Sequence, residues 1–353
     1  MSSLCAVPRR WAALGLFFGL AFSLLPPQAR AAEGPKAAPT RPRLGKVLGA
    51  DISFLPQLEA RGLKFSDQGV EKDVIQILKD HHFNYIRLRI FNDPAADSGY
   101  SPGKGFCDLP HTLALAKRVK QAGLKLLLDF HYSDTWADPQ KQFKPHAWLP
   151  LQGPALAQAV HDYTKQVLLA LRAQGTVPDM VQVGNEINHG MIWPDAQVQL
   201  SDSLARYDTL AQLVQAGASA VREVAPKTLV MLHIALGGQL QLSNAWLDRM
   251  AAHKVDFDVI GESYYPKWHG TIPDLQANLT QLARRYSQDV VVVEYSERKR
   301  EVNDVAFNLP GGKGKGTFIW EPLNTWEAVF DKQGQANDLL PIYDEISQKY
   351  KIK

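Results

Sequence analysis

Eight strand-like segments, each followed by a helix-like segment, lie between residues 46 and 350 and predict an α/β fold, a single-domain (β/α)8 or TIM barrel. The strand-like segments are apolar on both faces, which is typical of parallel strands covered by helices. A doubly wound open sheet is the alternative. Such sheets more often carry a glycine-rich phosphate turn after the first strand, whereas the first strand here ends in "GADIS". The barrel is therefore the better prediction.

The strands are predicted from runs of aliphatic and β-branched residues, at 46–53, 84–91, 124–134, 180–186, 228–235, 257–266, 289–296 and 314–322. The helices are predicted from apolar residues at intervals of three and four, at 70–82, 109–123, 154–175, 203–225, 242–253, 272–287, 297–307 and 336–350. The second and third of these helices end in glycine, as helices often do.

The first 31 residues have the pattern of a signal peptide. Arg9 and Arg10 precede the apolar run "WAALGLFFGLAFSLL", and "ARA" at 29–31 fits a small-x-small cleavage site, so we predict cleavage after Ala31. A membrane anchor is the alternative, but the apolar run is short for a span. The sequence therefore predicts a periplasmic or secreted protein with no membrane attachment after cleavage.

The mature chain is expected to begin with a flexible lead-in, residues 32–46, because this stretch is rich in proline and basic residues and has little to bury. Residues 47–353 are expected to form the barrel. Cleavage would remove Cys5 and leave Cys107 alone, so no internal disulfide is expected.

The composition of the chain argues against several classes of binding partner and cofactor. The chain has 353 residues, 45% hydrophobic and 21% charged, with a formal net charge of +3 and no long block of one sign. Neither a nucleic-acid partner nor an anionic membrane surface is indicated. No Walker motif and no Cys/His cluster is present in the sequence, so no metal and no cofactor is predicted. We expect a monomer.

In a TIM barrel the chemistry lies at the carboxyl ends of the strands. Every predicted strand carries a polar or aromatic group at that end, while the strand bodies are aliphatic. In chain order these residues are Asp51, Arg87, Arg89, Asp129, His131, Asn185, Glu186, His233, Glu262, Tyr264, Tyr265, Glu294, Tyr295, Trp320 and Glu321. Together they predict a polar cup at one end of the barrel.

Glu186 and Glu294 follow the fourth and seventh strands, so their carboxylates are expected to approach each other across the mouth of the barrel. Two facing carboxylates suit glycoside hydrolysis, in which one acid protonates the departing oxygen and the other attacks the anomeric carbon. A separation of about 5–5.5 Å predicts retention of configuration. Asn185 is expected to hold the sugar 2-hydroxyl.

Other strand-end residues receive supporting roles. Arg89 is expected to keep the nucleophile ionised, and Tyr264 is expected to position it by a hydrogen bond. Arg87 is interpreted as structural, paired with an aspartate inside the barrel. His233 is equally well a core histidine or a ligand contact. Glu262 and Glu321 are interpreted as surface or capping residues.

Aromatic residues indicate the class of substrate. Tryptophans fall in the loops after strands, where helix packing does not require them, and flat apolar faces edged by polar groups suit the rings of a polysaccharide. Besides the two catalytic candidates, the predicted substrate-binding residues are Asp51, Arg89, His131, Asp134, Trp136, Asn185, His233, Tyr264, Trp268 and Trp320.

Several motifs together resemble the endo-β-1,4-galactanases of glycosyl hydrolase family 53, in a clan of retaining (β/α)8 glycosidases. They are "GADIS", "NYIRLRIFNDP", "LLLDFHYSDTWADPQKQFKPHAW", "VQVGNEINHGMIWP", "FDVIGESYYPKWHG", "VVVVE" and "FIWEP", in order from residue 49 to 322. The resemblance implies Glu186 as acid/base, Glu294 as nucleophile, and β-1,4-galactan, a side chain of pectin, as substrate.

The sequence departs from the family pattern in two places. Glu294 is followed by "YSERKREVNDVAF", so the long loop that the family usually has after strand 7 is missing, and with it any cluster suited to the calcium ion of bacterial members. Leu236 stands where a polar residue is often expected. Two alternatives stay open: another endo-β-glycanase of the clan, acting on mannan, xylan or β-glucan, and a polysaccharide-binding barrel without activity.

Overall fold

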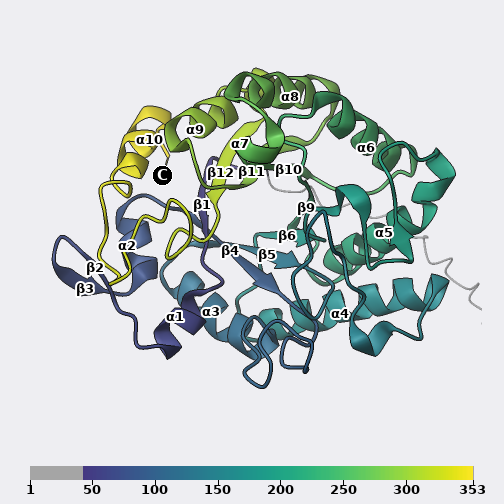
Figure 1. Cartoon of the computed structure of the whole chain (residues 1–353), viewed down its shortest axis with the longest axis horizontal. Helices are drawn as coiled ribbons and strands as arrows, with labels where there is room; N and C mark the ends of the chain where they lie inside the picture. The colour runs from purple at the N-terminus through teal and green to yellow at the C-terminus, as the bar shows by residue number, and fades with distance from the viewer. Residues whose placement is uncertain (1–42, 353) are drawn as a thin grey trace, which may run out of the picture. The chain divides into compact units, whose positions relative to one another are not determined.

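Eight parallel strands form a closed barrel in the computed structural model, which describes residues 43–352 (Figure 1). The strands follow one another around the barrel in chain order, and the last pairs with the first. They are β1 (Val47–Asp51), β4 (Tyr85–Ile90), β5 (Lys125–Phe130), β6 (Met180–Val183), β9 (Leu229–Ile234), β10 (Val259–Tyr264), β11 (Asp289–Tyr295) and β12 (Gly314–Ile319). The predicted fold class and all eight predicted strands are confirmed.

Helices surround the strands in Figure 1. The predicted ones are present as α2 (Val74–Asp80), α3 (Leu109–Gln121), α4 (Gly153–Ala173), α5 (Asp208–Val224), α6 (Leu240–Ala252), α8 (Ile272–Arg285), α9 (Lys299–Phe307) and α10 (Ile342–Tyr350). Capping residues determine where several of these helices begin. Asp73 and Asp108 accept hydrogen bonds from the first turns of α2 and α3, and Thr271 and Asp274 form a capping box at α8.

Smaller elements were not predicted. Helices α1 (Leu55–Ala60) and α7 (Pro266–His269) lie in strand–helix connections, as do the two-stranded sheets of β2 (Phe65–Asp67) with β3 (Val70–Lys72) and of β7 (Gly190–Met191) with β8 (Ala196–Gln197). The predicted helix 70–82 is wrong at its start, because 70–72 form β3 and the cap at Asp73 begins the helix.

At the amino-terminal ends of the strands, the barrel interior is filled by an apolar plug. Alternate residues of the strands point inward there, so the barrel is a packed core and not a pore. Gly49 is required in this layer, because a Cβ at that position would lie 2.1 Å from the Phe318 ring. The plug consists of Leu44, Val47, Tyr85, Leu127, Met180, Leu229, Met231, Val259, Val291, Val293 and Phe318. Burying each aliphatic side chain contributes about 1.5–3 kcal/mol.

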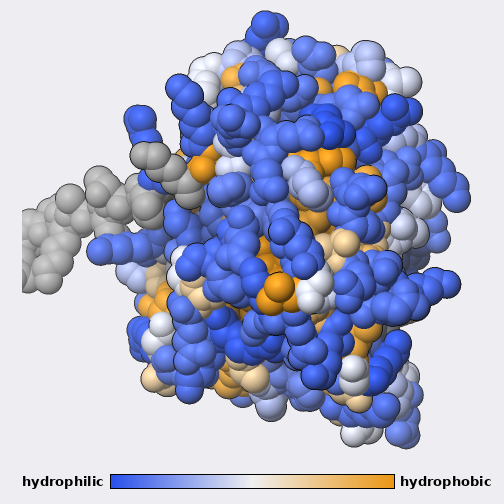
Figure 2. Space-filling view, turned by 90° about the vertical axis from the view of Figure 1, so that its left-hand side faces the viewer, coloured by the Kyte–Doolittle hydropathy of each residue, from blue (hydrophilic) through white to orange (hydrophobic). Residues whose placement is uncertain are grey.

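Leu44, which lies within the predicted lead-in, is buried in this plug. The predicted signal peptide (1–31) and residues 32–42 lie outside the described residues. Within 43–352, no helix is long and apolar enough to span a membrane. The face shown in Figure 2 is mostly hydrophilic, with hydrophobic residues as separate spots.

Candidate active site

Glu186 and Glu294 face each other above the apolar plug. One carboxylate oxygen of each, together with a ring nitrogen of His233, all lie within 4.8 Å of one another. Both residues are 8% exposed and line a pocket of about 290 Å³ at the carboxyl ends of the strands. The strands therefore bring together the two acids on which the sequence prediction depended.

An irregularity in β11 aims Glu294 into the barrel. Val291 and Val293 point inward and Tyr295 outward, where its hydroxyl lies 3.0 Å from that of Tyr343, so Glu294 breaks the alternation. The pairing register with β10 shifts between Glu262 and Ser263, and that with β12 shifts between Val292 and Tyr295. A bulge of this kind turns two successive side chains to one face, and here the second is the acid.

A sharp turn after β6 aims Glu186. Gly184 has φ 84°, and an added Cβ there would lie 2.6 Å from Ile187 Cγ2. Glu186 itself has φ 50° and ψ 50°, the left-handed region that residues other than glycine rarely adopt. Backbone strain of this kind concentrates at functional sites, where the surrounding structure enforces it.

Arg87 is the cation that contacts Glu294. Its Nη1 donates to Glu294 Oε2 at 2.9 Å and to Asp51 Oδ2 at 3.1 Å. Its Nη2 donates to Asp129 Oδ2 at 2.9 Å and to Asn185 Oδ1 at 2.8 Å. The expected pairing with aspartates is present, and Arg87 also has the contact with Glu294 that the sequence prediction gave to Arg89.

Arg89 lies elsewhere in the pocket. Its guanidinium carbon is 4.4 Å from the ring centroids of both Phe54 and Trp136, and its Nη1 donates to Glu321 Oε1 at 2.5 Å. The prediction that Arg89 keeps the nucleophile ionised is therefore wrong, because its guanidinium pairs with Glu321 and stacks on the Phe54 and Trp136 rings. Glu321 is likewise fully buried and not a surface residue.

Tyr265 makes the hydrogen bond that was predicted for Tyr264. The Tyr265 hydroxyl donates to Glu294 Oε1 at 2.8 Å, whereas the Tyr264 hydroxyl donates to the Gly270 carbonyl at 3.0 Å. Strand alternation explains the difference, because Ser263 faces the interior and Tyr264 therefore faces the helices. Counting in twos from Ser263 would have selected Tyr265 from the sequence.

A buried polar chain leads away from Glu186. Ser263 Oγ donates to Glu186 Oε1 at 2.6 Å and lies 2.7 Å from His233 Nε2, while His233 Nδ1 lies 2.9 Å from Asn185 Oδ1. His233 is fully buried, and Ser263 links it to the acid. Ser263 was not among the predicted site residues, although its place on the inner face of β10 could have indicated it.

Burial and charge separate the proton affinities of the two acids. Burial, and then the facing Glu294 carboxylate, raise the pKa of Glu186 well above its ordinary value. Burial also raises the pKa of Glu294, but Arg87 and the Tyr265 hydroxyl oppose that increase. Burial and the Arg87 charge lower the pKa of His233 well below its ordinary value, so this imidazole is neutral. The arrangement favours a protonated Glu186 beside an ionised Glu294.

A row of aromatic rings runs from the pocket into an adjoining groove. Trp136 and Trp320 have ring centroids 6.4 Å apart, Trp320 and Trp326 5.0 Å, Trp326 and Tyr265 5.2 Å, and Tyr265 and Trp268 5.8 Å. The last four of these rings border an adjoining groove of about 660 Å³ that also contains both acids. The geometry suits a chain of sugar rings that passes over the carboxylate pair.

The other predicted substrate-binding residues divide into two groups. Asp51, His131 and Asn185 line the 290 Å³ pocket together with Arg89, Trp136 and Trp320. Asp134, His233 and Tyr264 line neither the pocket nor the groove. Asp134 accepts backbone hydrogen bonds from Asp93 at 3.0 Å and His146 at 2.7 Å, so it holds loops in place.

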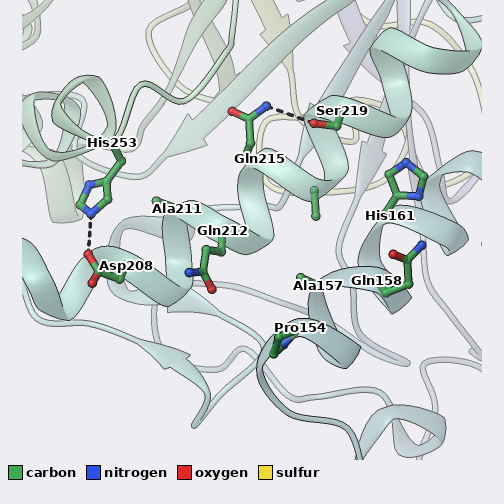
Figure 3. Close-up of a pocket in the computed structure, with 11 residues that line it drawn as sticks. Pro154, Ala157, Gln158, His161, Asp208, Ala211, Gln212, Gln215, Ser219 and His253 are labelled. Atoms are coloured by element: carbon green, nitrogen blue, oxygen red, sulfur yellow. Dashed lines mark hydrogen bonds and ion pairs between the residues drawn. The ribbon is translucent and has the colours of Figure 1, made fainter.

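Another hollow, of about 740 Å³, lies on the outer surface between α4 and α5 (Figure 3). Alanines and glutamines line much of it, and its drawn interactions are His253 with Asp208 at 2.9 Å and Gln215 with Ser219 at 3.1 Å. Asp208 is the one carboxylate among the lining residues. This hollow therefore lacks the facing acids of the barrel mouth.

The acids and His233 also supply the donor atoms that a metal ion would use. Among residues 43–352, Glu186, His233 and Glu294 form the one group of three close enough to hold an ion. Both ring nitrogens of His233 already have hydrogen-bond partners, Asn185 and Ser263. The sequence prediction that no metal is bound stays a prediction.

A TIM barrel with two facing, buried carboxylates at its strand ends defines a glycoside hydrolase. The chain belongs to glycosyl hydrolase family 53, whose model matches residues 47–306. The resemblance seen in the sequence motifs is thereby confirmed.

Relatives of this chain include proteins named as galactanases, and two of them are compared with it. The chain is 39% identical over 256 residues to the arabinogalactan endo-β-1,4-galactanase of Cellvibrio japonicus, covering 70% of this chain and 64% of that one. It is 33% identical over 302 residues to the endo-β-1,4-galactanase of Bacillus subtilis, covering 85% of this chain and 66% of that one. The chain thus spans about two thirds of each relative's length.

Among solved structures, the catalytic domain of a family 53 glycosyl hydrolase from Ignisphaera aggregans superposes with a TM-score of 0.77 at 33% identity. The match covers 87% of this chain and 97% of that one. The barrel fold is therefore shared with a domain of the same family.

Proposed function

We propose that this protein is an endo-acting glycoside hydrolase that cleaves β-1,4-galactan with retention of configuration, through Glu186 as acid/base and Glu294 as nucleophile. The observation that carries the proposal is the distance of at most 4.8 Å between oxygens of the two carboxylates. Retaining enzymes hold their carboxyl groups about 5–5.5 Å apart, whereas inverting enzymes leave about 6.5–9.5 Å for a water molecule. The observed spacing leaves no such room.

The geometry supports a two-step reaction. Glu294 forms a bond to the anomeric carbon while the bond to the leaving oxygen breaks and Glu186 gives that oxygen its proton. Glu186, now a carboxylate, then takes a proton from water as the water oxygen displaces Glu294 from the anomeric carbon. Arg87 and Tyr265 keep Glu294 ionised before attack, at 2.9 Å and 2.8 Å, and stabilise it as it leaves.

Galactan is the substrate we infer, because both named relatives are endo-β-1,4-galactanases. The aromatic row and the open groove support a polymer lying across the acids rather than a single sugar in a closed pocket. We also propose that the protein acts as an exported monomer whose signal peptide is removed after Ala31; amino-terminal sequencing of the secreted protein would then begin at Ala32.

The test is reducing-end release from galactan, mannan, xylan and β-glucan, by the wild type and by Glu294→Ala. We expect release from galactan, and loss of it by at least about 10⁴-fold in the variant, since the covalent step needs the carboxylate. Binding of galactan oligosaccharides should persist in the variant. Activity on another polymer instead would overturn the substrate, and near-normal activity of Glu294→Ala would overturn the assignment.

A further inference from the structure

The wall of the groove beside the nucleophile comes from the segment after β12. Strand β11 ends at Tyr295 and α9 begins at Lys299, so the connection between them, residues 296–298, is too short to reach over the groove. The segment 322–329 after β12 carries Trp326, which is 62% exposed and borders the groove. What holds this segment in place therefore decides the shape of the groove.

The base of the segment is anchored by packing. Leu323 and Val329 are fully buried, and the Val329 backbone N–H donates to the Pro322 carbonyl at 2.8 Å, which closes the loop. Asn337 Nδ2 donates to the Ala328 carbonyl at 2.9 Å. These contacts fix the two ends of the loop but not the position of the exposed indole at its tip.

Two side-chain contacts hold the tip: the Thr325 hydroxyl donates to the Glu321 carbonyl at 2.7 Å, and an ion pair with helix α9 holds Glu327. Lys299 Nζ donates to Glu327 Oε2 at 2.8 Å and to the Ser296 carbonyl at 3.0 Å. The Lys299 side chain is 2% exposed, although lysine is almost never fully buried, whereas that of Glu327 is 46% exposed. Separating Glu327 from this ammonium would leave a buried charge without its counter-ion, which is costly, so the ion pair holds Glu327 in place.

Glu327 is adjacent to Trp326 in the chain, and the Trp326 ring lies against Trp320 and Tyr265, with centroids 5.0 Å and 5.2 Å apart. Tyr265 in turn donates to Glu294. The ion pair between helix α9 and the loop therefore anchors the residue next to an exposed ring, and that ring contacts the hydrogen-bond partner of the nucleophile.

We propose that Lys299 and Glu327 are positioning residues that fix Trp326 as a sugar-stacking wall, and that Trp326 sets the preference of the enzyme for longer galactan oligosaccharides. The inference rests on the proposed function and deepens it. Neither residue of the ion pair touches the substrate, and both act through the indole. A stacking contact of this kind is worth about tenfold in affinity.

The experiment compares kcat and KM on β-1,4-galacto-oligosaccharides from trimer to heptamer. Trp326→Ala should raise KM for the heptamer about tenfold, and should raise KM for the shortest cleaved oligomer much less. Glu327→Gln and Lys299→Met should shift KM in the same direction. Glu301→Gln is the control, because it removes a half-exposed ion pair with Arg298 at 3.6 Å on the same helix.

The double variant Trp326→Ala/Glu327→Gln separates positioning from general support. If Glu327 acts through Trp326, the double variant will have the KM of Trp326→Ala alone. Additive effects, an equal loss for every oligomer length, or an unchanged KM in Trp326→Ala would overturn the inference. Glu327→Gln keeps an acceptor at a half-exposed position, so the test does not depend on folding of Lys299→Met.

Failure of the proposed function gives a different result. If the wild type cleaves no galactan oligomer, the substrate assignment fails, and the same variants are compared on oligomers of the polymer that is cleaved. A length-dependent KM in Trp326→Ala on that series would support the positioning role, and its absence would refute it.

Discussion

Arg87 Nη1 lies 2.9 Å from Glu294 Oε2, inside a barrel layer where Asp51 and Asp129 also contact this guanidinium, at 3.1 Å and 2.9 Å. One buried cation thus faces three carboxylates. The same contacts hold the polar layer together and keep Glu294 ionised, so the nucleophile and the stability of the barrel depend on one side chain.

Arg87→Met should lower the free energy of unfolding by about 3–5 kcal/mol at pH 7, because it leaves buried carboxylates without their partner. The loss should shrink at pH 4, because Arg87 lowers the pKa of Asp129 and of Glu294, and without it these two carboxylates take up protons more readily. Denaturant unfolding at both pH values measures this. Arg285→Met is the control, since its ion pair with Asp248 lies at the surface, with side chains 46% and 45% exposed. Equal losses in both variants would contradict the account.

Tyr265→Phe should move the acid limb of the kcat/KM profile to higher pH. The Tyr265 hydroxyl donates to Glu294 and lowers its pKa. Removing the hydroxyl therefore raises that pKa, so a larger fraction of Glu294 is protonated and inactive at a given acidic pH. We expect kcat to fall about 10- to 100-fold as well.

Tyr264→Phe is the matched control for this substitution, because the Tyr264 hydroxyl donates to the Gly270 carbonyl and not to Glu294. Its pH profile should coincide with that of the wild type. If the two variants shift the acid limb equally, the assignment of Tyr265 as the partner of the nucleophile is wrong.

Glu262 should make the barrel less stable as the pH rises. It is fully buried against Ser243 and the Leu236 backbone, and burial raises its pKa to about 8 from an ordinary 4.5. Between those values the folded state binds more protons than the unfolded state, so the free energy of unfolding falls with pH, by at most ~1.4 kcal/mol per pH unit.

Glu262→Gln removes this titration. The difference in the free energy of unfolding between variant and wild type should therefore increase in favour of the variant from about pH 5 to about pH 8. Urea unfolding at unit pH steps measures it. A difference that stays constant across this window would show that Glu262 is ionised throughout.

The barrel was predictable from the sequence because its strands are continuous aliphatic runs and its helices have a clear period of three to four. The two acids were also predictable, since each stands where an apolar strand stops. The small sheets of β2 with β3 and β7 with β8 were not, because they lie in loops whose strands are two or three residues long. Such short strands carry no readable period.

The supporting residues were harder to predict than the acids. Arg87 and Arg89 both point inward, and only the depth of each in the barrel decides which meets Glu294. The bulge in β11 is invisible in "VVVVEYS", where strict alternation would place Glu294 outward with Val292. Tyr265, in contrast, could have been found by counting from Ser263.

The oxygens of Glu186 and Glu294 lie too close together to leave room for an attacking water molecule between them. Proton NMR of the products formed in the first minutes of galactan-oligosaccharide cleavage tests it directly, because the anomer released first reports the stereochemistry before mutarotation. With retention of configuration, the β-anomer will appear first. Appearance of the α-anomer first would contradict it.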